Sequence, residues 1–315
     1  MQEYYRLFNQ LLDQLGIESG DLIYLHTSFK RMGYLALTGE QLLDALVERL
    51  GPNGTLVLPS FAWNLDKTAR PWKGYQEFFD ARPVFDVRNT PANIGWLPEL
   101  FRTMDDVKRS QNYFWPICAR GRLASEVTAD QEKIAHPYGA ESSFDRLRIH
   151  GVKILGLGVS LNTTSLALVP DYALGQDHPQ ELFTDKPQLG TLIDYHGKEI
   201  VTRSIWLLPE VVRQIKPSVL IEESRKLRDS VLRADRGSTI NFSYPFSSYY
   251  EEAIRLGREA GAANQAVPWL RDYSLKRNGL GTAATSKSGE TATDRGSRSA
   301  SVQGGPDFEI AEEKS

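Results

Sequence analysis

The order of apolar segments between residues 22 and 59 constrains the fold of this chain most. A short apolar run, Leu22 to Leu25, is followed by Thr38, which forms a capping-box pattern with Gln41 at the start of an amphipathic segment. A second apolar run occupies residues 55–59. A strand, a helix and a strand in this space predict two parallel strands joined by a right-handed crossover. The sequence therefore predicts an α/β protein.

Later segments extend this pattern. A third buried strand is expected at residues 152–158, and residues 190–208 alternate as two antiparallel strands would around His196 and Gly197. The loop that begins at Asn162 leads toward a further helix, which Pro170 is expected to cut short. We expect a mixed, largely parallel central sheet flanked by helices, with an antiparallel strand pair, in a single-domain three-layer architecture.

Composition sets the domain boundary and excludes several functions. Residues 280–315 are rich in small and charged side chains and are predicted to be a disordered low-complexity tail, which leaves residues 1–279 as the folded domain. A net charge of -3 argues against a nucleic-acid binder. The single cysteine, Cys118, excludes an internal disulfide, and no apolar run approaches the roughly 20 residues of a membrane span. We expect a soluble cytoplasmic protein that binds neither nucleic acid nor membrane.

The first apolar run ends in a cluster of polar residues: His26, Thr27, Ser28 and Lys30. Strand ends in α/β sheets are where ligands bind, and two hydroxyls, a ring and a cation are suited to a phosphate or a thioester carbonyl. A strand that ends in solvent with polar residues of no special role explains this segment alone equally well.

Four further segments, together with the one that contains His26, form an ordered set along the chain. The five are Asp21–Gly33, containing Leu-His-Thr-Ser-Phe-Lys; Phe85–Arg102; Lys108–Ala124, which begins Lys-Arg-Ser; His136–Ser143; and Lys153–Gly158. In order and spacing they resemble the motifs of the aminoglycoside 3-N-acetyltransferase family, and the resemblance covers about residues 1–260. It implies an α/β enzyme that uses acetyl-coenzyme A to acylate the amine of an aminoglycoside-like acceptor or another amino sugar, without a metal.

The resemblance also implies roles for individual residues. Thr27, Ser28 and Ser110 are expected to donate to the coenzyme's phosphates or pantetheine, and Lys30 and Arg109 to pair with its phosphates. Surface solvation or a structural turn is the alternative for each of these five. His26 either lines the thioester site or is a hydrogen-bonded ring at the end of a strand.

One departure from the family bears on catalysis. Where the family has a general-base histidine followed by a glutamate, this sequence has Ala167 and Pro170, with Asp171 one residue beyond. Three alternatives stay open: His178 folds back to form a displaced dyad with Asp171, Asp171 acts alone, or the chain binds coenzyme A or a sugar without turnover and serves as a scaffold.

The acceptor site and the oligomeric state are less constrained. Glu141 and Asp177, together with Asp171, are expected to form an acidic cluster suited to an ammonium substrate, although a charged surface explains them equally well. The sequence leaves a monomer and a homodimer open.

Overall fold

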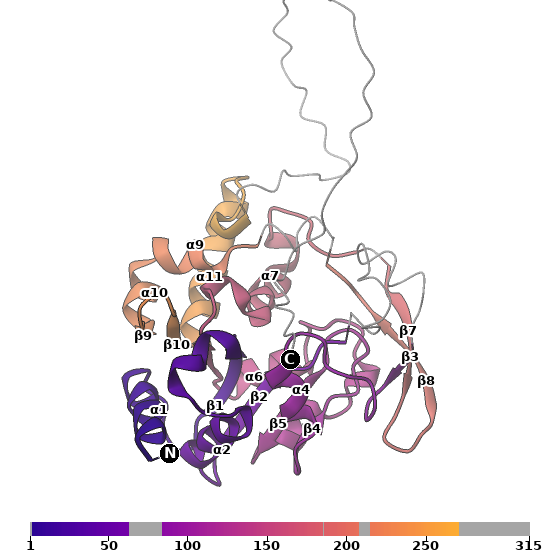
Figure 1. The fold of residues 1–315 in the computed structure, drawn as a ribbon. Coiled ribbons are helices and arrows are strands. Elements are labelled where there is room, and N and C mark those ends of the chain that lie inside the picture. Colours follow the sequence, from indigo (N-terminus) through magenta and orange to yellow (C-terminus); the bar gives the residue numbers. More distant parts are fainter. Residues whose placement is uncertain (1, 63–83, 185, 208–214, 271–315) are drawn as a thin grey trace, which may run out of the picture.

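The computed structural model describes residues 2–62, 84–184, 186–207 and 215–270 (Figure 1). The predicted tail at residues 280–315 lies outside the described residues. The strands are β1 (Leu22–Thr27), β2 (Thr55–Pro59), β3 (Val84–Asp86), β4 (Lys108–Arg109), β5 (Ile117–Gly121), β6 (Lys153–Leu157), β7 (Gln188–Ile193), β8 (Glu199–Ser204), β9 (Leu232–Arg233) and β10 (Asn241–Pro245).

Seven of these strands form one sheet in the order β4-β5-β2-β1-β6-β10-β9. Its centre is parallel, because β1 pairs in parallel with β2 on one side and with β6 on the other. The strands flanking this centre, β5 and β10, pair in antiparallel fashion with β2 and β6. The predicted mixed central sheet is therefore confirmed, and its parallel part consists of β2, β1 and β6.

The helices cover both faces of this sheet (Figure 1). They are α1 (Gln2–Gln14), α2 (Gly39–Leu50), α4 (Trp96–Arg102), α5 (Ala124–Thr128), α6 (Ser143–Ile149), α7 (Val169–Leu174), α9 (Pro217–Glu223), α10 (Arg225–Ser230) and α11 (Phe246–Ala262). Short 3-10 helices are η1 (Phe29–Leu35), η2 (Gln131–Lys133), η3 (Leu161–Thr163), η4 (Ser165–Leu168), η5 (Gly175–Asp177) and η6 (Pro268–Leu270).

Alternate residues of β1 belong to two separate hydrophobic cores. Ile23 and Leu25 pack with α1, α2 and α4 on one face of the sheet. Tyr24 packs on the other face with α6, α7 and α11. Successive side chains of a strand point to opposite faces, so the apolar run of β1 is buried on both sides. The predicted three-layer architecture is confirmed.

The crossover helix α2 begins where the sequence predicts. The Thr38 hydroxyl accepts a hydrogen bond from the Gln41 amide, and the Gln41 side chain accepts one from the Thr38 amide. Each partner satisfies an amide that the first helical turn would leave unbonded.

The helix expected near Pro170 differs from the prediction. Pro170 lies in the first turn of α7 instead of ending a helix. Proline is tolerated there because the amides of a first turn have no partner within the helix. The preceding residues, from Ser165 to Leu168, form the 3-10 helix η4.

A second sheet of three strands, in the order β3-β7-β8, lies beside the main one (Figure 1). Strands β7 and β8 form the predicted antiparallel pair and are joined by a turn that contains His196 and Gly197. No helix within the described residues is both long and apolar enough to cross a bilayer.

Candidate functional site

The carboxyl end of β1 lies where α/β proteins bind ligands. The chain continues from β1 through α2 to β2 on one side, whereas β6 pairs with β1 on the other side, so the connections diverge at β1. Ligand sites form outside the carboxyl ends of strands at such a point. The predicted polar cluster, Thr27, Ser28 and Lys30, lies there.

These three side chains differ in their surroundings. The Thr27 hydroxyl is buried and has no hydrogen-bond partner within the described ranges, and Ser28 is half-buried and makes no capping bond to η1. Lys30 is exposed. The Ser28 amide donates to the Leu157 carbonyl at 2.9 Å, so this amide is already used in joining β1 to β6.

His26 is buried on the sheet face that also holds Tyr24, with the two ring centroids 4.8 Å apart. Its Nε2 atom has no hydrogen-bond partner. Burial lowers the pKa of His26 to about 3, because the imidazolium would lose its hydration without gaining a counter-ion. His26 is therefore a neutral ring at physiological pH.

The structure brings His178 and Asp171 together. Nε2 of His178 lies 3.0 Å from Oδ1 of Asp171, and the two residues are 5% and 2% exposed. Trp269 donates its Nε1 hydrogen to the same carboxylate oxygen at 2.9 Å. The other oxygen, Oδ2, is buried and has no hydrogen-bond partner among the residues that the structure describes. The pairing that the displaced-dyad alternative requires is present.

Both ring nitrogens of His178 are nevertheless occupied. Nδ1 lies 2.9 Å from the Gln180 carbonyl and 3.1 Å from the Gln180 amide, while Nε2 faces Asp171. The Gln180 side chain in turn bonds to the backbone of Val267 and Leu270. In this arrangement His178 has no nitrogen left for a substrate proton, and the unpartnered oxygen of Asp171 is the only open acceptor of the pair.

Arg109 and Ser110 lie inside the molecule. The Arg109 guanidinium donates to the Thr90 and Ser60 carbonyls and lies over the Phe85 ring, and the Ser110 hydroxyl accepts from the Ile117 amide at 2.9 Å. Burial lowers the pKa of Arg109 to about 10, which leaves it charged at neutral pH. These contacts are typical of residues that stabilise the fold, whereas the sequence predicted contacts of Arg109 and Ser110 with the coenzyme.

The predicted acidic cluster does not form as one exposed surface. Asp171 is buried, whereas Glu141 and Asp177 are exposed. The Asp177 carboxylate lies 4.0 Å from Nε of Arg258. The buried Asp171 carboxylate is therefore separated from the two surface carboxylates. The sequence shows that the three acidic residues are present but not which of them is buried.

Two contacts near the site were not predicted. The Tyr24 hydroxyl lies 2.8 Å from the Ser165 hydroxyl and so links β1 to η4, the 3-10 helix that contains the buried Ala167. His136 packs against Tyr172 of α7 with ring centroids 4.0 Å apart, and burial lowers its pKa to about 4. The aromatic character of Tyr24 in an otherwise aliphatic run was the available signal for the first contact.

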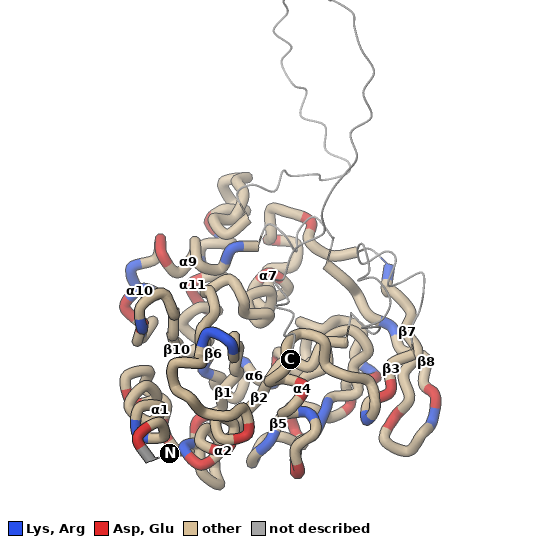
Figure 2. The backbone as a smooth tube through the Cα atoms, viewed as in Figure 1, with Lys and Arg blue, Asp and Glu red and all other residues tan. Residues whose placement is uncertain are grey.

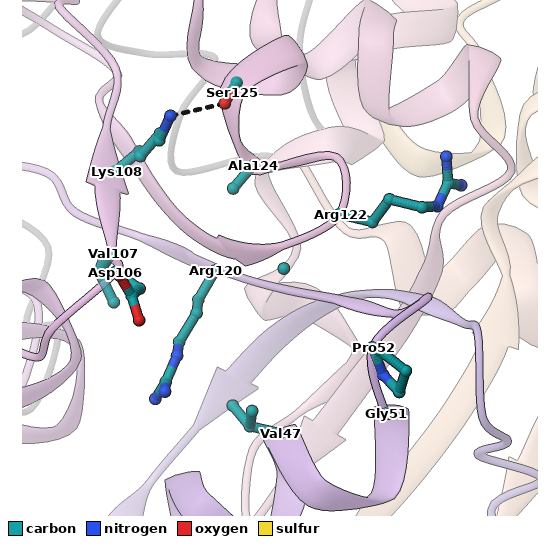
Figure 3. A pocket seen from close by; sticks show the side chains of 11 residues that line it. Val47, Gly51, Pro52, Asp106, Val107, Lys108, Arg120, Arg122, Ala124 and Ser125 are labelled. Atoms are coloured by element: carbon teal, nitrogen blue, oxygen red, sulfur yellow. Dashed lines mark hydrogen bonds between the residues drawn. The ribbon is translucent and has the colours of Figure 1, made fainter.

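A hollow of about 650 Å³ lies at the opposite edge of the sheet (Figure 3). It is lined by the end of α2 and by residues 106–108, 120–122 and 124–125, and the Arg120 side chain extends into it. None of the predicted site residues lines it. Since Gly121 pairs with Thr55 at the start of β2, this hollow faces away from the ligand-binding edge of the parallel strands.

Charged and metal-binding side chains do not point to a second binding site among the described residues (Figure 2). Acidic and basic residues are interspersed along the chain (Figure 2). Within the described ranges, no group of three or more His, Cys, Asp or Glu side chains is arranged to hold a metal ion.

Comparisons with known proteins agree with this fold. Aminoglycoside N(3)-acetyltransferase IX of Micromonospora chalcea is 31% identical over 170 residues, covering 51% of this chain and 58% of that protein. Aminoglycoside N(3)-acetyltransferase VII of Streptomyces paromomycinus is 32% identical over 187 residues, covering 56% and 62%. The chain thus spans about three-fifths of the length of these two curated relatives.

Solved structures and a family profile extend the likeness. The crystal structure of the aminoglycoside acetyltransferase AAC(3)-Xa superposes with a TM-score of 0.65 at 23% identity, over 82% of this chain and 92% of that one. The profile of the family described as Aminoglycoside 3-N-acetyltransferase matches residues 24–213, which is more than half of the sequence. The match begins in β1 and extends beyond β8, and the chain therefore belongs to the aminoglycoside 3-N-acetyltransferase family.

Proposed function

We propose that this protein transfers an acetyl group, or a related acyl group, from coenzyme A to the amine of an aminoglycoside or another amino sugar. The observation that supports this most is the family match over residues 24–213, which includes β1 and its polar loop. Solved proteins of the same fold include AAC-IIIb in a binary complex with CoASH and AAC-VIa bound to sisomicin. We further propose a cytoplasmic location, in keeping with one buried free thiol, Cys118.

The carboxyl end of β1 is the proposed position of the thioester. The buried Thr27 hydroxyl lacks a partner and the Ser28 side chain makes no capping bond, so both are available to the pantetheine arm. Exposed Lys30 is available to the coenzyme's phosphates. Because the Ser28 amide is bonded to Leu157, the proposed oxyanion donors are the next two amides, of Phe29 and Lys30.

The proposed reaction is a direct transfer. The neutral amine of the acceptor attacks the thioester carbonyl, a C–N bond forms, the C–S bond breaks, and coenzyme A leaves as its thiol. The proton that the nitrogen loses must reach a protein group or the departing sulfur. No covalent intermediate on the protein is needed.

We assign proton acceptance to Asp171. A buried polar atom without a partner is costly, and such an atom in a native fold calls for a ligand or an ordered water. Oδ2 of Asp171 is such an atom, while His178 and Trp269 hold Oδ1 in place. His178 then acts as a positioning residue, because both of its nitrogens are engaged.

The test is release of free thiol from acetyl-coenzyme A with a panel of amino sugars. Asp171→Asn should lower turnover about a hundredfold to ten-thousandfold, the usual contribution of general-base assistance. Asp229→Asn, a change of the same chemistry at an exposed position of α10, should leave turnover unchanged. His178→Gln should lower turnover less than Asp171→Asn and leave the pH profile in the same place.

The alternative function is binding without turnover, and calorimetry separates it from the proposal. Heat on titration with acetyl-coenzyme A but no thiol release with any acceptor would support the binding protein. Absence of acetyl-coenzyme A binding would refute the transferase, and absence of binding to amino sugars as well would refute the binding protein. An Asp171→Asn variant as active as the native protein would refute the assigned proton acceptor.

A further inference from the structure

Among the described residues, strand β8 leaves one of its edges unpaired. It is the last strand in the order β3-β7-β8, and the β7–β8 hairpin lies at the rim of the molecule (Figure 1). At the turn the Asp194 amide donates to the Lys198 carbonyl at 2.9 Å. In an antiparallel pair every second residue pair exchanges hydrogen bonds, so the backbone groups of residues 199, 201 and 203 point away from β7.

The same three residues present their side chains to solvent. Glu199, Val201 and Arg203 are exposed, and Val201 is 65% exposed, whereas Thr202 and Ser204 on the opposite face are buried. Val201 pairs with Thr191, which in turn pairs with Val84, and Val84 and nearby Leu189 are also exposed. The solvent face of the small sheet therefore has an apolar stripe that reaches its open edge.

Open strand edges tend to pair with other strands unless proline, a bulge or a covering segment blocks them. Strand β8 contains no proline, and its register with β7 runs without interruption from residue 199 to residue 204. Beyond its end, the Ile205 amide is bonded to the Ala135 carbonyl. Strand β8 also lies against η2, which precedes Ala135, so described residues cover the edge at this end of the strand. Residues 199, 201 and 203 keep exposed side chains, and no backbone bond from the described residues reaches them on the outer side.

The charges on this edge are arranged symmetrically about Val201. Glu199 lies two residues before it and Arg203 two residues after it. If two copies of β8 pair in antiparallel fashion with Val201 opposite Val201, Glu199 of each copy faces Arg203 of the other. Ile200 then faces Thr202, and residues 199, 201 and 203 supply the hydrogen-bonding groups. An interface of this kind uses the same patch on both copies.

We propose that this edge is the interface of a homodimer, in which two copies of β8 pair about a two-fold axis at Val201. The two three-stranded sheets join into one continuous sheet. Backbone hydrogen bonds supply affinity and the two Glu199–Arg203 pairs fix the register. A second copy is the favoured occupant because a copy of this strand necessarily brings the matching charge order with it.

Charge reversal tests the register in the full chain by sedimentation over a series of protein concentrations. Glu199→Arg places two arginines opposite each other at both ends of the paired strands, and Arg203→Glu does the same with two glutamates. Each variant should raise the dimer dissociation constant by about tenfold or more, since like charges directly opposite each other are destabilising. Glu48→Arg, on an exposed position of α2, is the matched control and should dimerise as the native chain does.

Two combinations make the test specific. The double variant Glu199→Arg with Arg203→Glu restores the opposite pairs and should dimerise again. A mixture of the two single variants should form heterodimers, because each arginine then faces a glutamate. Val201→Pro should abolish dimers while keeping the β7–β8 pair, since the amide it removes points away from β7.

Three results would overturn the proposal. They are a native chain that stays monomeric at every concentration, dimers that both charge reversals leave unaffected, and single variants that remain monomeric when mixed. Pairing of β8 with a different protein would appear as the first of these.

Discussion

At the scale of single residues, the hydrogen bonds that a polar side chain already makes decide whether it is open to a ligand. Arg109 was expected to pair with the coenzyme's phosphates, yet its guanidinium bonds to backbone carbonyls and stacks on Phe85. A sequence shows that a cation is present but not whether it faces solvent. The pairing of Asp171 with His178 was within reach of sequence analysis because the two lie only seven residues apart.

Arg109→Met should destabilise the fold. The change leaves the Thr90 and Ser60 carbonyls without donors, at an expected cost of about 3 kcal/mol in the free energy of unfolding, measured by urea denaturation. Arg233→Met, at an exposed position, is the control and should cost less than about 0.5 kcal/mol. If Arg109→Lys folded normally but bound acetyl-coenzyme A much more weakly, the phosphate contact expected from the sequence would be supported instead.

His26 should make the protein less stable in acid. Its pKa is about 3 in the folded state and about 6.5 in the unfolded state, so below pH 6.5 the unfolded state takes up a proton that the folded state does not. Stability is therefore lost progressively as the pH falls from about 6.5 to about 3, and at pH 5 the loss from this residue is about 2 kcal/mol.

The measurement compares the free energy of unfolding at pH 5 and pH 7.5. His26→Gln should show a smaller loss between these two values than the native chain, whereas exposed His196→Gln should show the same loss as the native chain. Part of the acid sensitivity should persist in His26→Gln, because burial also lowers the pKa of His136. An unchanged pH dependence in His26→Gln would contradict the buried, unpaired ring.

At the scale of elements, the sequence predicts β1, α2, β2 and β6 because each has its own spacing of apolar residues and is bounded by a turn or capping residue. The region after β6 was harder. Pro170 reads as a helix breaker, but in the structure it begins α7, since proline fits the first turn. What decides between these readings is the packing of η4, where Ser165 reaches the Tyr24 hydroxyl on β1. A contact between residues so distant in sequence is not encoded locally.

The cap of α2 allows a direct test of local encoding. Thr38→Ala removes the hydroxyl that accepts from the Gln41 amide and should lower the free energy of unfolding by about 1 kcal/mol in urea. Thr38→Ser keeps the hydroxyl and should stay within a few tenths of a kcal/mol of the native value. Equal losses in both variants would mean that the methyl group, not the cap, stabilises the start of the helix.

At the scale of the whole molecule, the last described segment is fixed to the middle of the chain. Trp269 bonds to Asp171, and Gln180 bonds to the backbone of Val267 and Leu270. Composition alone predicts the domain boundary at residue 279. Composition does not show which residues before this boundary stabilise the fold. That information resides in contacts between residues nearly a hundred positions apart.

Two truncations test this attachment. A chain that ends at residue 279 should unfold at the same urea concentration as the full chain, because it keeps residues 267–270 and loses only the segment predicted to be disordered. A chain that ends at residue 266 loses Trp269 and leaves the buried Asp171–His178 pair without its indole donor, so it should unfold at a clearly lower concentration. Equal midpoints for these two chains would contradict the attachment.

The alternation of β1 between two cores has a consequence for divergence within the family. Tyr24 and His26 lie on the side of α6, α7 and α11, so a substitution at either position changes the packing on that side. Ile23 and Leu25 pack with α1, α2 and α4 on the opposite side. The sheet thus insulates one half of the protein from repacking in the other. Residues of one layer can change while the opposite layer continues to stabilise the fold.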